Sequence, residues 1–380
     1  MEAKSGLDRI YEPVKEELRT VEKRLYELVP ADMEPISTVE KYIFDNGGKR
    51  LRPALVLLSA RAVHSVETVP NGNGSGNGGS VASLLERAIT FAVAAELIHT
   101  ATLVHDDLLD GSILRRGYKT INSGWGNEIA VLLGDHLYLK ATEILTGKNI
   151  LGSERSENFE QIYRASNLML QTAAKIFQGE VLQHKKRGKL STTEEDYFHI
   201  IESKSASFIS SCCMIGALLD GSTCPGADES LASYGLNLGM AFQIRDDILD
   251  IMGDEKRIGK AVGSDLKEGR LTLPIIHLMA NAQDGDREFF KSVLGNSGNK
   301  KGSLFSRWRK NSHRTGNNGF VKKQLPRIRE TLLDCGSVAY SMDIAANFAE
   351  AAKRDLEKIP DSQARQSLMF LADHVMNREN

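Results

Sequence analysis

The sequence predicts an all-α protein, and three observations carry that prediction. Apolar residues recur at three-and-four spacing over eight long segments, no segment alternates convincingly as a strand, and few prolines interrupt the pattern. The 380 residues, 41% hydrophobic and 26% charged, have the composition of a soluble globular protein. That length could form two domains, but one long helical bundle can use it for a single core.

The eight segments with helical spacing follow one another along most of the chain. They are residues 7–29, 36–63, 81–110, 127–146, 157–186, 193–220, 229–251 and 327–358. Pro53, in "GGKRLRPA", falls in the first turn of a helix, where its missing N–H costs little.

Charge and cysteine content exclude several classes of protein. A formal net charge of -2 argues against a nucleic-acid binder, which needs a concentrated basic face. The four cysteines form no CxxC pair and have no histidine at zinc spacing, so we expect free thiols. The start "MEAKSGLDRI" has no basic region followed by an apolar run, and no stretch reaches about 18 uninterrupted apolar residues. We therefore expect a cytoplasmic protein without a membrane span.

Two segments interrupt the helical pattern and are expected to be insertions. Residues 71–80, "NGNGSGNGGS", are typical of a flexible linker, and a phosphate loop is disfavoured because the GK[ST] ending is absent. Residues 295–319 mix basic residues with Leu304, Phe305 and Trp308. A disordered insertion is one interpretation; contact with an anionic membrane surface, at about 1 kcal/mol per cation, is the other.

Two acidic motifs give the strongest functional signal. "HDDLLDGSILRRG" contains Asp106, Asp107 and Asp110, and "FQIRDDILD" repeats the DDxxD pattern at the end of another apolar helix. Carboxylates one helical turn apart repel each other unless a cation lies between them. Mg²⁺ takes one or two protein carboxylates and completes its shell with water and phosphate oxygens. The pair of motifs therefore predicts a magnesium site that holds a diphosphate.

The chain also offers more positive charge than one diphosphate needs. Basic residues follow both motifs and stand in "GGKRLRP", at the start of a helix whose dipole attracts anions. The surplus predicts two diphosphate substrates side by side.

The motifs resemble those of the trans-type polyprenyl diphosphate synthases, most closely the long-chain members. The matching stretches stand in family order over nearly the whole chain: "GGKRLRP", "ELIHTATLVHDDLLDGSILRRG", "GNEIAVLLGDHLYLKA", "GEVLQ", "FQIRDDILD", "GKAVGSDLKEGRLTLP" and "LADHVMNREN". The resemblance implies a single domain over residues 1–380, a bundle of long, mostly antiparallel helices around a central cavity, and a homodimer. It also implies that isopentenyl diphosphate condenses with an allylic diphosphate by ionisation, attack of the double bond and loss of a proton.

The resemblance implies a role for each matching residue. The metal ligands would be Asp106, Asp107, Asp110, Asp246, Asp247 and Asp250. The allylic diphosphate would be bound by Arg115, Lys204 and Lys260, with Gln243 facing its allylic end. Isopentenyl diphosphate would be bound by Lys49, Arg52, His99 and Arg116. Ser205 and Arg270 would also bind substrate; they replace the usual threonine and lysine and keep their hydroxyl and charge. Gly111 and Ser112 remove one negative charge near the motif, and His105, His136, His184 and His199 are expected to be structural.

In this family the growing product runs along the helix before the first acidic motif. Small residues, Ala101 and Thr102, stand five and four positions before Asp106, which predicts a long product unless a bulky floor such as Phe91 stops it. A shorter-chain synthase, a class I terpene cyclase and a non-catalytic subunit of a heteromeric synthase are the alternatives. The cyclase would not need the isopentenyl-binding residues, and the subunit would be expected to have lost site residues. Whether the product serves quinone side chains, carotenoids or lipids stays open.

Overall fold

The protein is almost entirely helical in the computed structural model, as the sequence predicts. The structure describes residues 6–29, 33–64, 81–147, 150, 159–220, 224–254, 262–298 and 318–378. Their one sheet is a hairpin of two antiparallel strands, β1 (Leu114–Arg115) and β2 (Tyr118–Lys119), in which Arg115 lies opposite Tyr118. The all-α prediction is confirmed.

The elements of the N-terminal half surround one very long helix. They are α1 (Gly6–Tyr11), η1 (Glu12–Val14), α2 (Lys15–Glu27), α3 (Ile36–Asp45), α4 (Leu51–Val63), α5 (Val81–Asp110), α6 (Ile121–Trp125), α7 (Asn127–Thr146) and α9 (Phe159–Lys186).

The elements of the C-terminal half include the helix of the second acidic motif. They are α10 (Glu194–Ile201), η2 (Glu202–Ala206), α11 (Ser207–Leu218), α12 (Ala227–Met252), α14 (Ser264–Glu268), α15 (Leu273–Asn281), α16 (Asp284–Gly298), α18 (Asn318–Asp334), α19 (Ser337–Asp355), η3 (Leu356–Lys358) and α20 (Gln363–Asn377).

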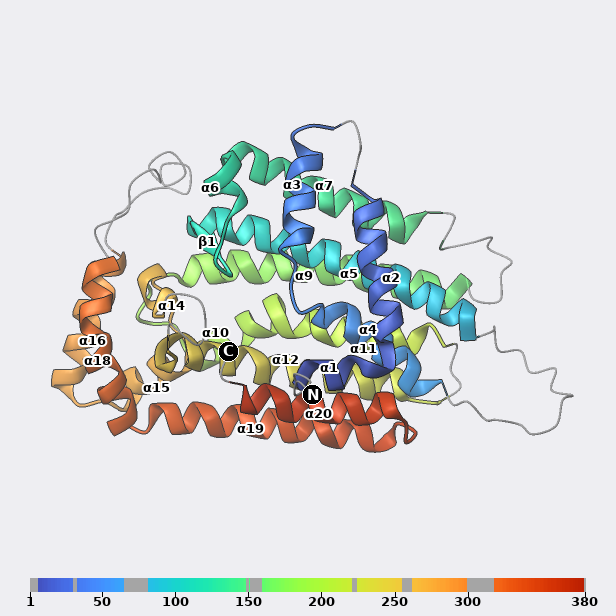
Figure 1. The fold of residues 1–380 in the computed structure, drawn as a ribbon. Helices are drawn as coiled ribbons and strands as arrows, with labels where there is room; N and C mark the ends of the chain where they lie inside the picture. The colour runs from blue at the N-terminus through green and yellow to red at the C-terminus, as the bar shows by residue number, and fades with distance from the viewer. Residues whose placement is uncertain are drawn as a thin grey trace, which may run out of the picture.

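The long helices lie roughly along one direction. Figure 1 shows α5, α9, α12 and α19 in this arrangement, with α2 and α3 crossing them and α14, α15, α16 and α18 gathered at one end. Among the larger packing contacts are those of α4 with α5 and α11, α11 with α12, and α12 with α19. Gly216 permits one of them, since a Cβ there would lie 2.4 Å from the carbonyl oxygen of Val56.

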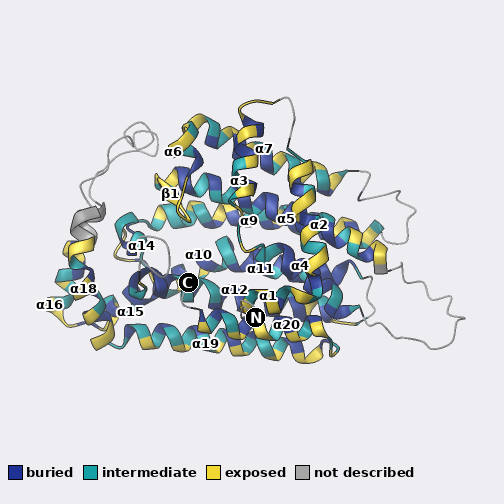
Figure 2. Cartoon of the chain, in the orientation of Figure 1, coloured by how far each residue is buried: buried dark blue, intermediate teal, exposed yellow. Residues whose placement is uncertain are grey.

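The core lies between these helices, and α4 and α5 are buried on nearly every side (Figure 2). Such all-round apolarity marks a helix inside a protein rather than on its surface. A smaller apolar cluster, including Leu266, Leu278 and Phe290, joins α14, α15 and α16 at the end of the bundle. α5 is long and apolar enough to cross a bilayer, but 72% of its most apolar window is buried within the protein, so it is weak evidence for a span.

Four of the predicted helical segments are interrupted in the structure. Residues 7–29 form α1 and α2, with the short 3₁₀ turn η1 between them. Residues 36–63 form two helices, because the chain turns at Arg50, whose φ of 50° is left-handed. Residues 327–358 are divided at Gly336, with a φ of 66°. Residues 193–220 are not one regular α-helix, because the π-helical turn η2 separates α10 from α11. Helices α6, α14, α15, α16 and α20 lie outside the predicted segments.

Both predicted insertions fall largely outside the described residues. This holds for 71–80 and for the part of 295–319 between α16 and α18. The membrane-contact interpretation of the second insertion therefore stays a prediction.

Candidate active site

The two acidic motifs lie at the C-terminal ends of α5 and α12. The helix dipole is negative there, so clustered carboxylates are unfavourable without cations. Basic side chains meet the first motif: Lys204 Nζ lies 3.2 Å from Asp106 Oδ2, and Arg115 Nε donates to Asp107 Oδ2 at 2.8 Å. Asp110 pairs with Arg270.

The carboxylates of the second motif are held mainly by hydrogen bonds. Asp247 accepts from the Tyr197 hydroxyl at 2.7 Å and from the Gln243 amide at 2.9 Å. Asp250 accepts from the hydroxyl and backbone N–H of Ser264, at the start of α14, and from the next backbone N–H at 3.1 Å. These bonds fix the orientation of both carboxylates.

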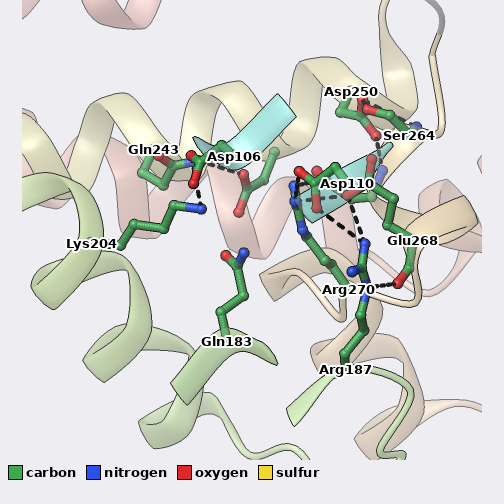
Figure 3. A network of polar contacts seen from close by, with 12 residues as sticks. Asp106, Asp110, Gln183, Arg187, Lys204, Gln243, Asp250, Ser264, Glu268 and Arg270 are labelled. Atoms are coloured by element: carbon green, nitrogen blue, oxygen red, sulfur yellow. Dashed lines mark hydrogen bonds and ion pairs between the residues drawn. The ribbon is translucent and has the colours of Figure 1, made fainter. Parts of the chain in front are cut away.

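Two chains of polar contacts join the motifs (Figure 3). Arg270 pairs with Asp110 and lies 3.3 Å from Asp265, whose backbone N–H donates to Asp250. On the other side, the Ser205 hydroxyl donates to Gln243 at 2.9 Å, and Gln243 donates to the second motif. Lys204 is the neighbour of Ser205, so both motifs meet the same turn.

That turn is the π-helical element η2, and it lies against α9. Gly179 makes the approach possible, because a Cβ there would lie 2.8 Å from the backbone nitrogen of Lys204. Glu180, the next residue, forms an ion pair with Lys204. Lys204 therefore lies between carboxylates from α5 and α9.

A cavity of about 110 Å³ opens between these groups. Its lining includes Lys204, Gln243, Asp247 and Arg270, together with Arg187, which follows α9. One predicted metal ligand, Asp247, therefore lines the same cavity as the predicted substrate-binding residues Lys204 and Arg270.

Burial dominates the electrostatics of the acidic residues. It raises the pKa of Asp106 and Asp107, and raises that of Asp247 well above its usual range. Burial alone would also raise the pKa of Asp110, but Arg270 and Arg187 outweigh it and lower that pKa. For Lys204, burial opposes the charge, yet Asp106 and Glu180 outweigh it and raise the pKa.

The donor set fits hard divalent cations. Asp107 Oδ1 is buried without a hydrogen-bond partner, and oxygen donors are what Mg²⁺ prefers. Within the described residues no three acidic, histidine or cysteine side chains converge as a complete ligand set. A cation here would thus bind one or two carboxylates and take its other ligands from water and phosphate.

A second basic region lies at the start of α4. Arg52 Nη1 lies 3.0 Å from Nε2 of His99, and Arg52 Nε is buried without a partner. Burial, and then Arg52 and Arg116, push the pKa of His99 well below its usual range, so the ring is neutral and accepts this bond. Lys49 lies in the same positive electrostatic field. Its pKa is lowered first by burial and then by the positive charges of Arg378 and Arg116.

Two glycines make room for arginines at this helix start. A Cβ on Gly47 would lie 2.2 Å from the guanidinium of Arg50, and one on Gly48 would lie 2.4 Å from that of Arg116. Arg50 and Arg116 are the described non-glycine residues with left-handed backbone, at φ of 50° and 54°. Such strain persists only where the surroundings impose it. Here Arg50 forms a buried ion pair of 2.6 Å with Glu96 of α5.

The structure places the described site residues in two regions, one around the acidic motifs and one at the start of α4. Lys260 lies outside the described residues. Of the histidines expected to be structural, His105 contacts α7 near Asp135, and His136 lies 3.6 Å from Glu40.

Several site residues were not singled out from the sequence. They are Glu180, Gln183, Arg187, Tyr197, Asp265, Glu268 and Arg378. Glu180 and Gln183 stand in "GEVLQ", a stretch that offered a signal. Tyr197 gave none, because one tyrosine on an apolar helix face resembles a core residue.

Arg378 ties the C-terminal segment to the second motif. Its guanidinium lies 2.6 Å from Asp246 Oδ1 and 3.8 Å from the ring centroid of Phe242. Arg245 holds the same segment by donating to the backbone oxygen of Arg378.

The two residues expected to border the product channel differ in exposure. Ala101 has no exposed surface and belongs to the main apolar cluster. Thr102 is partly exposed, and its hydroxyl donates to the backbone oxygen of His99. Phe91 is fully buried on the same face of α5 as Thr102, about 16 Å farther from the acidic motif.

Comparison with known proteins identifies the family of this chain. Residues 33–307 match the family model described as polyprenyl synthetase. A short chain isoprenyl diphosphate synthase from Methanothermobacter thermautotrophicus is 32% identical over 91% of each chain. The octaprenyl diphosphate synthase of Escherichia coli is 31% identical over 98% of this chain and 99% of that protein.

A solved structure extends the similarity to three dimensions. The polyprenyl synthase from Caulobacter crescentus, complexed with calcium and isoprenyl diphosphate, has a TM-score of 0.77 and 30% identity over 98% of both chains. The relatives range from short-chain to octaprenyl synthases, so they leave the product length undetermined. The chain belongs to the polyprenyl synthetase family and is a prenyltransferase.

Proposed function

We propose that the enzyme condenses isopentenyl diphosphate with an allylic diphosphate in a magnesium-dependent reaction and builds a long all-trans polyprenyl diphosphate. One observation carries this proposal: Lys204 and Arg270 line a cavity with Asp247 of the second acidic motif and pair with Asp106 and Asp110 of the first, and a separate basic region lies at the start of α4. Two anion-binding regions suit two diphosphate substrates.

The first region would bind the allylic diphosphate. Magnesium held by the two acidic motifs would neutralise the diphosphate as it departs with the electrons of the broken C–O bond. Arg115, Lys204 and Arg270 would bind its oxygens, because charge-assisted hydrogen bonds strengthen as negative charge develops. Gln243, fixed by Ser205, would face the allylic end.

The second region would hold isopentenyl diphosphate. Arg52 and Arg116 offer planar guanidinium groups that can engage two phosphate oxygens each, and Lys49 adds a point charge. The neutral ring of His99 orients Arg52. With its diphosphate held there, the double bond attacks the allylic carbon, a C–C bond forms, and a proton is lost.

The long product is proposed from the face of α5 that leads away from the site. Thr102 is small and partly exposed, four residues before Asp106, so this face offers no bulky stop next to the acidic motif. Phe91, farther along the same face, is the first aromatic residue on the way.

A homodimer is proposed from exposed apolar side chains. Leu132 and Leu139, seven residues apart on one face of α7, are 57% and 69% exposed. Ile113 and Leu114, after the first acidic motif, are 69% and 61% exposed. A partner subunit would cover such exposed apolar side chains, which is why they support the proposed dimer.

Product analysis tests the proposed reaction. Purified enzyme, magnesium and labelled isopentenyl diphosphate are incubated with dimethylallyl, geranyl, farnesyl or geranylgeranyl diphosphate, and the dephosphorylated products are separated by length. We expect a ladder that extends beyond geranylgeranyl, and a loss of at least 100-fold in kcat for Asp106→Asn.

Asp343→Asn, on the exposed surface of α19, is the matched control and should elongate normally. No elongation with any primer would contradict the proposal and favour a non-catalytic subunit.

A further inference from the structure

Two arginines and two carboxyl groups alternate in a ring at one side of the site. Arg187 Nη2 lies 3.2 Å from Asp110 Oδ1 and 3.1 Å from Glu268 Oε2. Arg270 Nη2 lies 2.7 Å from the same oxygen of Glu268 and pairs with the other oxygen of Asp110. Figure 3 shows the two guanidinium groups between the two carboxylates.

The backbone holds Arg187 in this place. The residue follows α9, and the N–H of Gly188 donates to the carbonyl oxygen of Gly269 at 2.7 Å. Arg187 Nε also donates to the backbone oxygen of Glu268. The loop after α9 and the loop after α14 are therefore joined, and the guanidinium, with a side chain only 15% exposed, lines the cavity.

Arg187 and Arg270 are equivalent in this geometry, since each contacts both Asp110 and Glu268. The resemblance to the family assigned substrate binding to Arg270 and gave no role to Arg187. Yet a guanidinium that contacts Asp110 occupies an oxygen that a metal ion would need. When the metal takes Asp110, both arginines lose that partner and can turn their N–H groups to phosphate oxygens.

We propose that Arg187 is a third guanidinium of the allylic diphosphate site, beside Arg115 and Arg270, and that Glu268 is its positioning residue. This inference rests on the proposed function. Without ligand, Arg187 neutralises Asp110; with metal and diphosphate present, it binds the diphosphate while Glu268 keeps it at the cavity wall.

A purely structural role for Arg187, tying the two loops, makes different predictions. Loss of a loop tie would weaken the binding of every ligand and lower the melting temperature. If Arg187 instead competes with the metal ion and binds diphosphate, its loss should leave Mg²⁺ binding unchanged or tighter and should weaken diphosphate binding.

Titration calorimetry on the full chain distinguishes the two roles. Arg187→Gln is titrated with Mg²⁺ alone and then, at saturating Mg²⁺, with inorganic diphosphate and with a non-ionisable thio-analogue of an allylic diphosphate. We expect Mg²⁺ alone to bind as tightly as to wild type or more tightly. Both diphosphates should bind roughly 10- to 100-fold more weakly, the loss expected for hydrogen bonds to a charged group.

Three further variants complete the test. Arg187→Lys keeps the positive charge but lacks the planar pair of N–H donors, so its diphosphate affinity should lie between those of wild type and Arg187→Gln. Glu268→Gln should weaken diphosphate binding less than Arg187→Gln does. Lys185→Gln, an exposed cation two residues away, should leave all the affinities unchanged.

Unchanged diphosphate affinity in Arg187→Gln, or equal weakening of Mg²⁺ and diphosphate binding, would overturn the inference. Neither result would contradict the proposed function. That proposal is contradicted separately if the wild-type enzyme binds no allylic analogue and elongates no primer.

Discussion

At the scale of single residues, the site depends on charges that are buried with incomplete partners. Asp107 Oδ1 and Arg52 Nε are buried and lack hydrogen-bond partners, and we propose that the metal ion and the substrates supply them. The sequence supplied most of these residues, because acidic and basic side chains at fixed spacing carry chemistry in themselves. It could not supply Arg187 or Tyr197, whose roles depend on which loop or helix faces the cavity.

Thr102→Phe should shorten the product. A ring at this partly exposed position would block the face of α5 that leads away from Asp106. The longest product in the elongation assay should fall by several isoprene units, with the rate of the first condensation reduced less than ten-fold.

Ala101→Phe serves as the comparison for Thr102→Phe. Ala101 is fully buried, so the larger side chain should cost about 1–3 kcal/mol of folding stability through overpacking. An unchanged ladder in Thr102→Phe would show that this face does not border the channel.

Glu40→Gln should stabilise the protein at pH 8 and change little at pH 4. Burial raises the pKa of Glu40 to about 7, above its ordinary value, so the neutral form is favoured in the folded state. Stability from this group is present below about pH 4.5 and is lost as the pH rises through 7. Removing the charge should recover about 1–3 kcal/mol at pH 8.

Urea denaturation at the two pH values measures that difference. Glu357→Gln, at an exposed position, should show no such pH dependence. Equal stabilities of wild type and Glu40→Gln at pH 8 would contradict the expectation.

At the scale of elements, the helices were largely predictable from spacing, and their breaks were not. The apolar pattern of residues 36–63 continues through the turn at Arg50, whose backbone is left-handed and whose side chain forms a buried ion pair with Glu96. Gly47 and Gly48 were the local sign of that turn. The boundary at Gly336 had a similar sign, whereas the docking of the loop after α9 on the loop after α14 had none.

Glu96→Gln tests how strongly α5 holds the start of α4. Glu96 and Arg50 have side chains that are 5% and 10% exposed, so removing one charge leaves the other buried and poorly compensated. We expect a loss of about 3–5 kcal/mol in the free energy of unfolding and a raised KM for isopentenyl diphosphate.

Glu86→Gln is the matched control on the same helix. Its carboxylate pairs with Arg24 but is 60% exposed, so the loss should stay below about 1 kcal/mol. Similar losses in the free energy of unfolding for both variants would show that the buried ion pair contributes no more to stability than the exposed one.

At the scale of the whole molecule, the proposed homodimer depends on the exposed side of α7. Changing Leu132 and Leu139 together to lysine places two charges on that face, so the dimer should dissociate. Sedimentation velocity should show twice the chain mass for wild type and the chain mass for the double variant.

Leu333→Lys, at a 56% exposed position on α18, should sediment like wild type. A monomeric wild-type enzyme, or an unchanged dimer in the double variant, would contradict the proposed interface.

The π-helical turn at Glu202–Ala206 has a consequence for sequence comparison. A π-helical turn contains one residue more than the α-helical turn that it replaces. It places Lys204 and Ser205 next to the two acidic motifs. Deleting one residue would restore a regular helix but rotate the segment before the turn by about 100° relative to the segment after it. A one-residue gap at this point in an alignment would therefore mark a relative with a displaced lysine, even where every motif is intact.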